Sequence, residues 1–205
     1  MIRSITIFIL LFLISWSYDA EAAYRLDSLK RDSIVHDTDM WTTGQLVNFS
    51  CRGYIVRNSA GRVVSGMLGV NTIILCADNV YREFARGYVV EFDSQGRLMR
   101  GTPAVSVEVE VQGQIVASRS YSEVVFYPNG VVKSLIPIEN FKYVTADGSR
   151  IVVSSSGGVN FSRDGKIVKA TLARRVVSVG AEGRMKSHGT GDVIFIDDDG
   201  TILDR

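Results

Sequence analysis

Hydrophobic and polar residues alternate one by one along most of the chain after residue 43. In one clear stretch, Val107, Val109 and Val111 alternate with two glutamates. Alternation with a period of two is typical of a β-strand that has one buried face and one face in water. Because no window of twelve or more residues keeps a helical period of 3.6, the pattern predicts an all-β protein.

Tight turns interrupt this alternation at a nearly constant interval of 17 or 18 residues. Most turn positions are glycines that follow Asn, Asp, Gln or Glu, a pairing that favours β-hairpins because glycine adopts a positive φ without steric cost. An interval of this length holds two strands of about six residues and two connections. The ten positions are Gly44, Gly61, Asp78, Gly96, Gly113, Gly130, Gly148, Gly165, Gly183 and Gly200.

Alternate turns fall into two classes, so the true repeat is about 35 residues long and has two unlike halves of 17–18 residues. Repeats of this length are typical of one supersecondary unit stacked on its neighbours. We therefore expect a single domain over residues 44–205, in which antiparallel β-hairpin repeats form one elongated, twisted or rolled sheet. A β-jellyroll or a two-sheet sandwich is the alternative. In one class, a small residue follows the turn (Gly66, Gly101, Ser134, Ala170), and then Leu68, Pro103, Pro137 or Leu172.

A phenylalanine precedes four of these turns, one in each repeat. The sequence predicts that the four rings form a stacked row inside the core, and a ligand-binding stripe is the alternative function of the same row. For stability, we expect Phe161→Ala to cost most, Gly165→Val less, and Gly157→Val least, since Gly157 lies in a serine-rich connection. The row consists of Phe92, Phe126, Phe161 and Phe195.

The first 22 residues have the pattern of a secretory signal peptide. Arg3 precedes an apolar run over residues 5–14, and small residues end the segment at Ala22. A membrane anchor is the alternative, but the run of about ten residues is short for a span of about 20. We expect cleavage after Ala22, export to the periplasm or the extracellular space, and no membrane-spanning segment in the mature chain.

Residues 23–43 lack the alternating pattern. Leu26 and Leu29 lie at helical spacing among charged residues, which indicates an N-terminal arm or a short helix. Such a segment either covers one end of the sheet or docks a partner.

The residue types of common catalytic and metal sites do not converge in this sequence. His36 and His188 have no neighbouring ligands at metal-site spacing, and we expect both at the surface. Residues 197–200 resemble a calcium loop, but Phe195 occupies the place of the first ligand, which favours an acidic hairpin turn. No nucleophile elbow or phosphate loop occurs, and the net charge of +1 argues against nucleic-acid binding. We expect no enzyme activity, no cofactor and no metal.

The two cysteines, Cys51 and Cys76, would meet an oxidising environment after export, which favours a disulfide. The turn spacing places them near opposite ends of their strands, some 15–20 Å apart, too far for a bond. We therefore predict that they are not joined.

Two stretches, residues 126–134 and 161–172, repeat an aromatic, two or three polar residues, Asn/Asp-Gly, and an apolar-Lys-small tail. This unit resembles the repeat of exported bacterial proteins with MORN-like hairpin repeats. The resemblance covers about residues 55–205 and implies an architecture, without catalytic residues to transfer. The period of 35 is longer than usual for that family, and the copy at Gly61 lacks the aromatic residue.

Together these patterns predict an exported, non-enzymatic β-repeat protein of the cell envelope that acts as a scaffold or interaction module. Its partner is then an unknown protein or another envelope component. A periplasmic lipid or glycolipid carrier with an apolar β-groove is the alternative, because alternating valines and a row of phenylalanines suit acyl chains.

Overall fold

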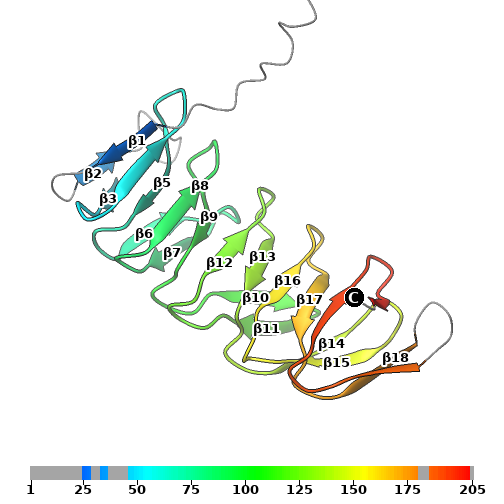
Figure 1. The fold of residues 1–205 in the computed structure, drawn as a ribbon. Coiled ribbons are helices and arrows are strands. Elements are labelled where there is room, and N and C mark those ends of the chain that lie inside the picture. The colour runs from blue at the N-terminus through cyan, green and yellow to red at the C-terminus, as the bar shows by residue number, and fades with distance from the viewer. Residues whose placement is uncertain (1–24, 29–32, 37–45, 180–184, 204–205) are drawn as a thin grey trace, which may run out of the picture.

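The computed structural model describes residues 25–28, 33–36, 46–179 and 185–203. Within these residues the chain forms 21 short strands and no helix, and every strand pairs with its neighbours in antiparallel fashion. The strands follow one another along an elongated body, from the blue end to the red end of the ribbon (Figure 1). This arrangement confirms the predicted all-β fold of antiparallel hairpin repeats.

Eleven strands form one continuous sheet, which we call the main sheet. Apart from β1, it is built from successive hairpins, and each hairpin pairs with the next one along the chain. In spatial order the strands are β1 (Arg25–Ser28), β4 (Tyr54–Arg57), β5 (Val63–Met67), β8 (Val89–Phe92), β9 (Leu98–Gly101), β12 (Val124–Phe126), β13 (Val132–Leu135), β16 (Val159–Phe161), β17 (Ile167–Thr171), β20 (Val193–Ile196) and β21 (Ile202–Leu203).

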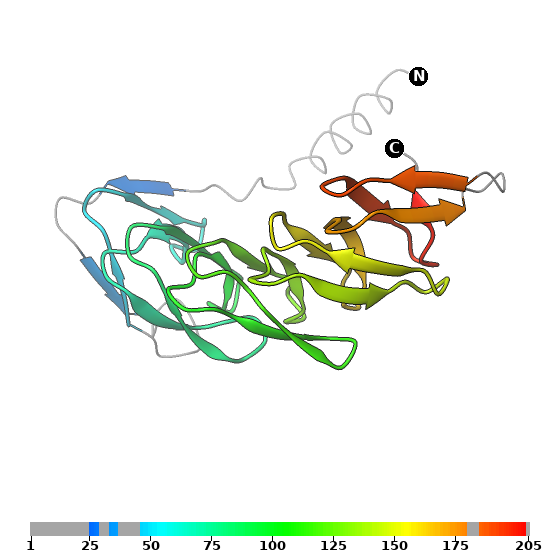
Figure 2. The ribbon, with the colours of Figure 1, turned by 90° about the horizontal axis from the view of Figure 1, so that it is seen from below.

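The other ten described strands form five separate hairpins, which we call the second layer. Seen from below, the successive hairpins follow one another along the long axis (Figure 2). The second-layer hairpins are β2 (Ser33–His36) with β3 (Leu46–Phe49), β6 (Thr72–Leu75) with β7 (Tyr81–Phe84), β10 (Glu108–Val111) with β11 (Gln114–Ala117), β14 (Phe141–Val144) with β15 (Arg150–Val153), and β18 (Val176–Val179) with β19 (Met185–His188).

The two unlike halves of the repeat are therefore one main-sheet hairpin and one second-layer hairpin. The sequence analysis expected one sheet, whereas the structure divides the strands between an 11-stranded sheet and five separate hairpins. After each of the first four main-sheet hairpins the chain leaves the sheet through a single bridge to the preceding second-layer hairpin. Two of these bridging residues are prolines, which lack the N–H needed to continue a ladder. The bridges are Phe49 with Leu68, Phe84 with Pro103, Ser118 with Pro137, and Val153 with Leu172.

The predicted glycine turns have the expected geometry. At Gly130, φ is 89°, its N–H donates to the Tyr127 carbonyl, and the Tyr127 N–H donates to Val131. Gly165 has the same conformation, with a φ of 77°. In the hairpin of β6 and β7 the glycine place belongs to Asn79, with a φ of 63°, and not to Asp78 as the spacing suggested. Asparagine tolerates this left-handed conformation better than most residues.

Long polar side chains join successive main-sheet turns. Arg62 Nη1 donates to the Ser94 carbonyl at 3.1 Å, and Lys166 Nζ donates to Asp198 at 3.4 Å. Arg62 and Lys166 each directly follow a turn glycine. After Gly130 this position is Val131, and the Asn129 amide donates instead to the Arg163 carbonyl of the next turn. These bonds hold neighbouring hairpins in register.

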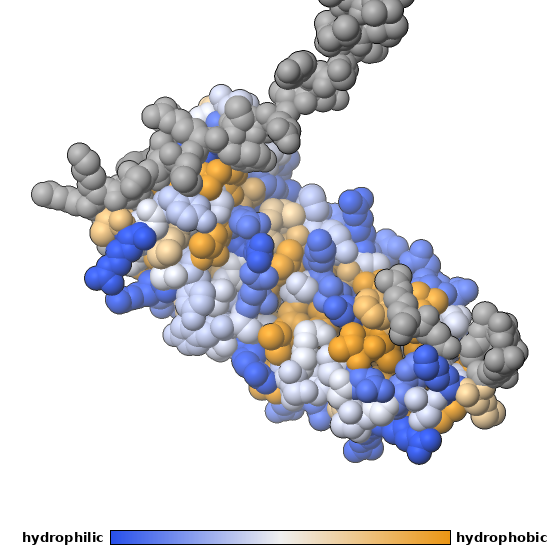
Figure 3. All heavy atoms as spheres, in the orientation of Figure 1, coloured by the Kyte–Doolittle hydropathy of each residue, from blue (hydrophilic) through white to orange (hydrophobic). Residues whose placement is uncertain are grey.

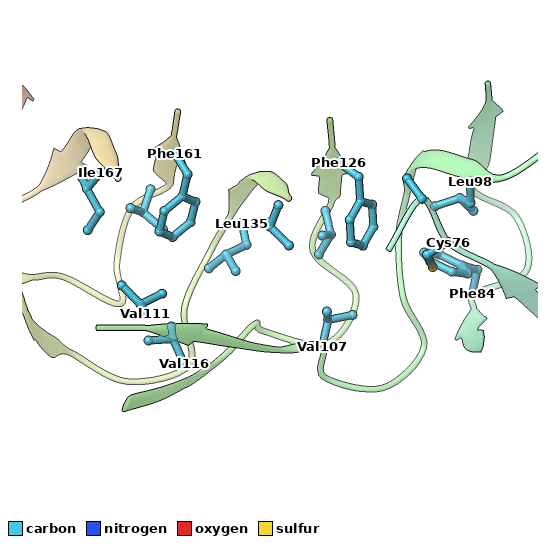
Figure 4. Close-up of a cluster of buried hydrophobic side chains, with 14 of the residues drawn as sticks. Cys76, Phe84, Leu98, Val107, Val111, Val116, Phe126, Leu135, Phe161 and Ile167 are labelled. Atoms are coloured by element: carbon cyan, nitrogen blue, oxygen red, sulfur yellow. The ribbon is translucent and has the colours of Figure 1, made fainter. Parts of the chain in front are cut away.

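The core lies between the main sheet and the second layer. Phe126 and Phe161 point from their strands toward the hairpin of β10 and β11, where Val111 and Val116 lie (Figure 4). The exposed fractions of Phe92, Phe126 and Phe161 are 7%, 1% and 3%. Thus three of the four predicted rings fill the core.

Phe195 does not belong to this row. Phe92, Phe126 and Phe161 each precede their turn glycine by four residues, whereas Phe195 precedes Gly200 by five. Side chains alternate between the faces of a strand, so one residue of difference moves Phe195 to the outer face, where the Lys169 ammonium lies 5.4 Å from its ring centre. Ile196, 5% exposed, takes the core position instead.

Residue sizes in the two layers compensate each other. Gly66 and Gly101 lie so close to second-layer phenylalanine rings that an added Cβ would come within 2.5 Å of Phe49 Cδ1 or 2.8 Å of Phe84 Cδ1. At the equivalent positions of the next two repeats, the main sheet has larger residues and the second layer has smaller ones. The pairs of equivalent positions are Gly66 and Phe49, Gly101 and Phe84, Leu135 and Ser118, and Ala170 and Val153. The sequence analysis assigned Ser134 to this set, but Ser134 pairs with Asn160 in the outward row of the sheet, and Leu135 is the buried residue.

The segment predicted as an N-terminal arm or short helix contains strands β1 and β2 where it is described. β1 pairs along its whole length with β4, from Arg25 opposite Arg57 to Ser28 opposite Tyr54. This pairing satisfies the edge of the main sheet and explains why an extended conformation replaces the helical alternative. The predicted signal peptide lies outside the described residues.

Candidate functional site

The residues singled out by sequence do not converge on one site. The three buried phenylalanines pack in the core, and Phe195 lies on the opposite face of the main sheet. Residues 197–200 form the predicted hairpin turn, in which Asp197 Oδ1 accepts from the Thr201 N–H at 2.8 Å. Among the described residues, no three His, Cys, Asp or Glu side chains are grouped to hold a metal ion, and no helix is long and apolar enough to cross a membrane.

His188 is buried, which corrects the prediction of a surface position. The register of β18 and β19 places it opposite Val176 on the inner face of the hairpin. Its Nε2 lies 3.0 Å from the hydroxyl of Ser178, which is also buried. His36 falls in β2, of which only the backbone is described.

A half-buried ion pair joins the second layer to the aromatic row. The Arg82 guanidinium makes two 2.7 Å contacts with the Asp78 carboxylate and lies 5.5 Å from the centre of the Phe126 ring. Cys76 is fully buried beside them, and it is not joined to Cys51, as predicted. Burial raises the pKa of the Cys76 thiol to about 12, although Arg82 acts in the opposite direction.

We expect Cys76 to resist alkylation by iodoacetamide in the folded protein up to a pH near 12, because the thiolate is the reactive form. In denaturant the same thiol should react near its ordinary pKa of 9.0. Mass spectrometry of digested, pulse-alkylated protein measures this difference at each cysteine. Rapid labelling of Cys76 at pH 8 without denaturant would contradict its placement in the core.

The outer face of the second layer carries exposed aliphatic residues at repeat spacing. Ile73, Ile115 and Val177 are 64%, 65% and 51% exposed, and they lie on three different hairpins. Each side chain points away from the core because its strand neighbours point inward. Other exposed hydrophobic residues on this face are Leu46, Tyr81, Val144, Val179 and Met185. Figure 3, in the orientation of Figure 1, shows hydrophobic groups emerging in several places among hydrophilic ones.

The hairpin of β10 and β11 differs from its neighbours in the length of its turn. Only Gln112 and Gly113 separate the paired residues Val111 and Gln114, and both have positive φ, 51° and 76°. The hairpins before and after it have five residues at the same place. A two-residue turn of this kind is favoured in hairpins, but it makes the tip of the hairpin shorter.

The shorter tip leaves a cavity of about 330 Å³ at the turn edge of the molecule. In the neighbouring repeats the longer tips fill this place: Ala77 and Asp78 pack against Gly130, and Ala146 and Asp147 pack against Gly200. At Gly165 nothing lies within 4 Å of the position that a Cβ would take. The cavity is lined by Val109, Val111, Val132, Phe161, Gly130 and Gly165, with Asp78, Glu108 and Glu110 also in the lining.

Sequence reasoning predicted the strand that contains Val109 and Val111 but missed the cavity beside it. The total spacing between turns stays at 17 residues through this region, so the interval gave no sign of the altered turn. The sequence feature that could have shown it is local: the Ala-Asp pair of the other two tips is replaced by Val111 and Gln112.

No protein-family model matches the chain, and no curated protein matches it.

Proposed function

We propose that the protein is an exported, non-enzymatic β-repeat protein of the cell envelope that acts as an interaction module. One observation carries this proposal: every described second-layer hairpin presents at least one exposed aliphatic side chain on the same outer face. Large exposed apolar surfaces are typical of interaction sites. Hairpin arrays also offer long, regular binding surfaces.

The packing of the interior supports a surface role. The aromatic row is buried between two layers whose residue sizes compensate each other, so these rings present little area to a ligand. The signal-peptide pattern supports export, and N-terminal sequencing of the exported protein should begin at Ala23 or within a few residues of it. We also propose kinship with the exported MORN-like hairpin-repeat proteins, which the hairpin repeat supports at the level of architecture.

Photo-crosslinking tests the proposed binding face. Benzoylphenylalanine placed at Ile73, Ile115 or Val177 should yield the same protein adduct from all three positions in cells that export the protein. The matched controls carry the probe at Ser65 and Ser134, on the outer face of the main sheet. Equal adducts from the control positions, or none from the three test positions, would contradict the proposal.

A lipid or glycolipid carrier is the second candidate, and the cavity beside Gly165 is the observation that favours it. Its lining includes the apolar residues Val109, Val111, Val132 and Phe161. Its volume of about 330 Å³ is at the lower end of the range for ligand pockets, which is about 300–1,000 Å³. A cavity of this size suits a side chain or a short alkyl group better than a complete acyl lipid.

A further inference from the structure

Strand β10 pairs with β11 on one side only, and its backbone groups on the other side lack partners within the described residues. In an antiparallel hairpin, pairs that exchange hydrogen bonds alternate with pairs that do not. The Ser118 N–H donates to the Val107 carbonyl at 2.7 Å, so these two residues form a hydrogen-bonded pair. The next pair, Glu108 with Ala117, is therefore one that does not exchange hydrogen bonds, and the two kinds alternate along the hairpin. Glu108 and Glu110 therefore direct their N–H and C=O groups away from β11, toward the side where the cavity lies.

The next hairpin shows how this chain covers an edge of the same type. Gln112 accepts from the Val144 N–H at 3.0 Å and donates to the Val144 carbonyl at 2.6 Å, as a neighbouring strand would. Gln114 donates to the Lys142 carbonyl in the same way. The side chains of one hairpin thus satisfy the edge strand β14 of the next.

No equivalent cover exists for β10 among the described residues. The turn residue that corresponds to Gln112 in the preceding hairpin is Asp78, and its carboxylate is held by Arg82 at 2.7 Å. In the part of the chain that the structure describes, the edge of β10 thus lacks the side-chain cover that the edge of β14 has. Unpaired strand edges are templates for pairing with another chain.

Two features of the surroundings define which chain fits. On the inner side, the cavity beside β10 offers apolar space next to Val109 and Val132. On the outer side, Glu108 and Glu110 are exposed, and none of the ion pairs in the described part of the chain includes them. An incoming strand with apolar side chains inward and cationic side chains outward satisfies both faces.

The same charges disfavour a second copy of this chain. Antiparallel pairing of β10 with β10 would place Glu108 of one copy opposite Glu110 of the other. Like charges directly opposite each other destabilise a strand pair.

We propose that β10 binds an extended segment of a partner protein by antiparallel strand addition. The segment alternates Lys or Arg, opposite Glu108 and Glu110, with apolar residues that enter the cavity beside Val109. This deepens the proposed interaction role, on which it rests, by assigning one site and one class of partner sequence.

The test uses the peptide acetyl-Lys-Val-Lys-Val-Lys-amide and the amide spectrum of the ¹⁵N-labelled protein. Saturable shifts should appear at Glu108, Glu110 and the cavity residues. In antiparallel pairing the lysine N–H groups face β10 and the valine N–H groups face away. A peptide N-methylated at the lysines should therefore lose binding, while one N-methylated at the valines should keep it. Equal binding of the two methylated peptides, or binding of neither them nor the parent peptide, would overturn the proposal.

Charge is tested separately. Glu108→Gln/Glu110→Gln should weaken binding of the peptide about three- to tenfold, since each cross-strand ion pair contributes up to about 1 kcal/mol. The matched control, Glu83→Gln/Glu139→Gln, removes the same charge from other exposed or half-buried sites and should change binding less than about twofold. An equal loss in both variants would show unspecific attraction and contradict the site. If the peptide does not bind β10, crosslinks from Ile73 and Val177 can still form. The strand-addition proposal can therefore be rejected while the interaction module is kept.

Discussion

Phe161→Ala is expected to lower the free energy of unfolding by about 3–5 kcal/mol. The ring is 3% exposed and packs between the main sheet and the hairpin of β10 and β11 (Figure 4). Removing it leaves a cavity that two rigid layers cannot close. Urea melts that share a slope with the parent protein measure the loss. A loss below about 1 kcal/mol would contradict its place in the core.

The structure reverses the order of stability losses expected for two glycine variants, Gly165→Val and Gly157→Val. Gly165→Val forces a branched side chain into a φ of 77°, but the surrounding space is open, so a cost of about 1–3 kcal/mol is expected. At Gly157, a Cβ would meet the side chain of Thr171 well inside contact distance. Gly157→Val should therefore cost more than Gly165→Val, the reverse of the order that the serine-rich sequence suggested.

The second large effect is expected from exchanging residue sizes between the layers. Phe84→Ser should cost about 3–5 kcal/mol through a cavity, and Gly101→Leu about 1–3 kcal/mol or more through overpacking. The double variant recreates the combination that Ser118 and Leu135 have one repeat later. We therefore expect it to be more stable than the sum of the single losses implies, by about 2–3 kcal/mol.

A control separates this coupling from a general gain in hydrophobicity. Phe84→Ser combined with Ser134→Leu places the new leucine on the outward row of the main sheet, away from the gap. The effects of these two changes should add. Additive losses in the Phe84→Ser/Gly101→Leu variant as well would show that the two positions do not share one packing unit.

The fold could be predicted from the sequence because its strongest constraints are local. Alternating valines define strands, and a turn such as that at Gly130 needs a residue that tolerates positive φ. The division into two layers could not be predicted in the same way, since the turns of both layers follow one another at the same interval of 17 or 18 residues. What separates them is the bridge at residues such as Leu68 and Pro103, which joins segments 19 residues apart.

The errors at single residues have a common cause. Strands alternate faces at every residue, so a shift of one position reverses a side chain, as happened for Phe195 and Ser134. Counting from the turn glycine would have placed Ile196 and Leu135 in the core. The edge of β10, by contrast, depends on the order of hydrogen-bonded pairs and on which side chains cover a neighbouring hairpin. These are properties of packed layers, and a single sequence does not display them.

Native mass spectrometry of the protein purified from the exported fraction tests most directly whether it acts through its surface or through its interior. Because the interior between the layers is filled by side chains, the mature chain should appear without bound lipid. Phe161→Ala should lower its stability and should also appear without bound lipid. A stoichiometric acyl-lipid adduct on the parent protein that is lost in Phe161→Ala would contradict the interaction module and establish the carrier.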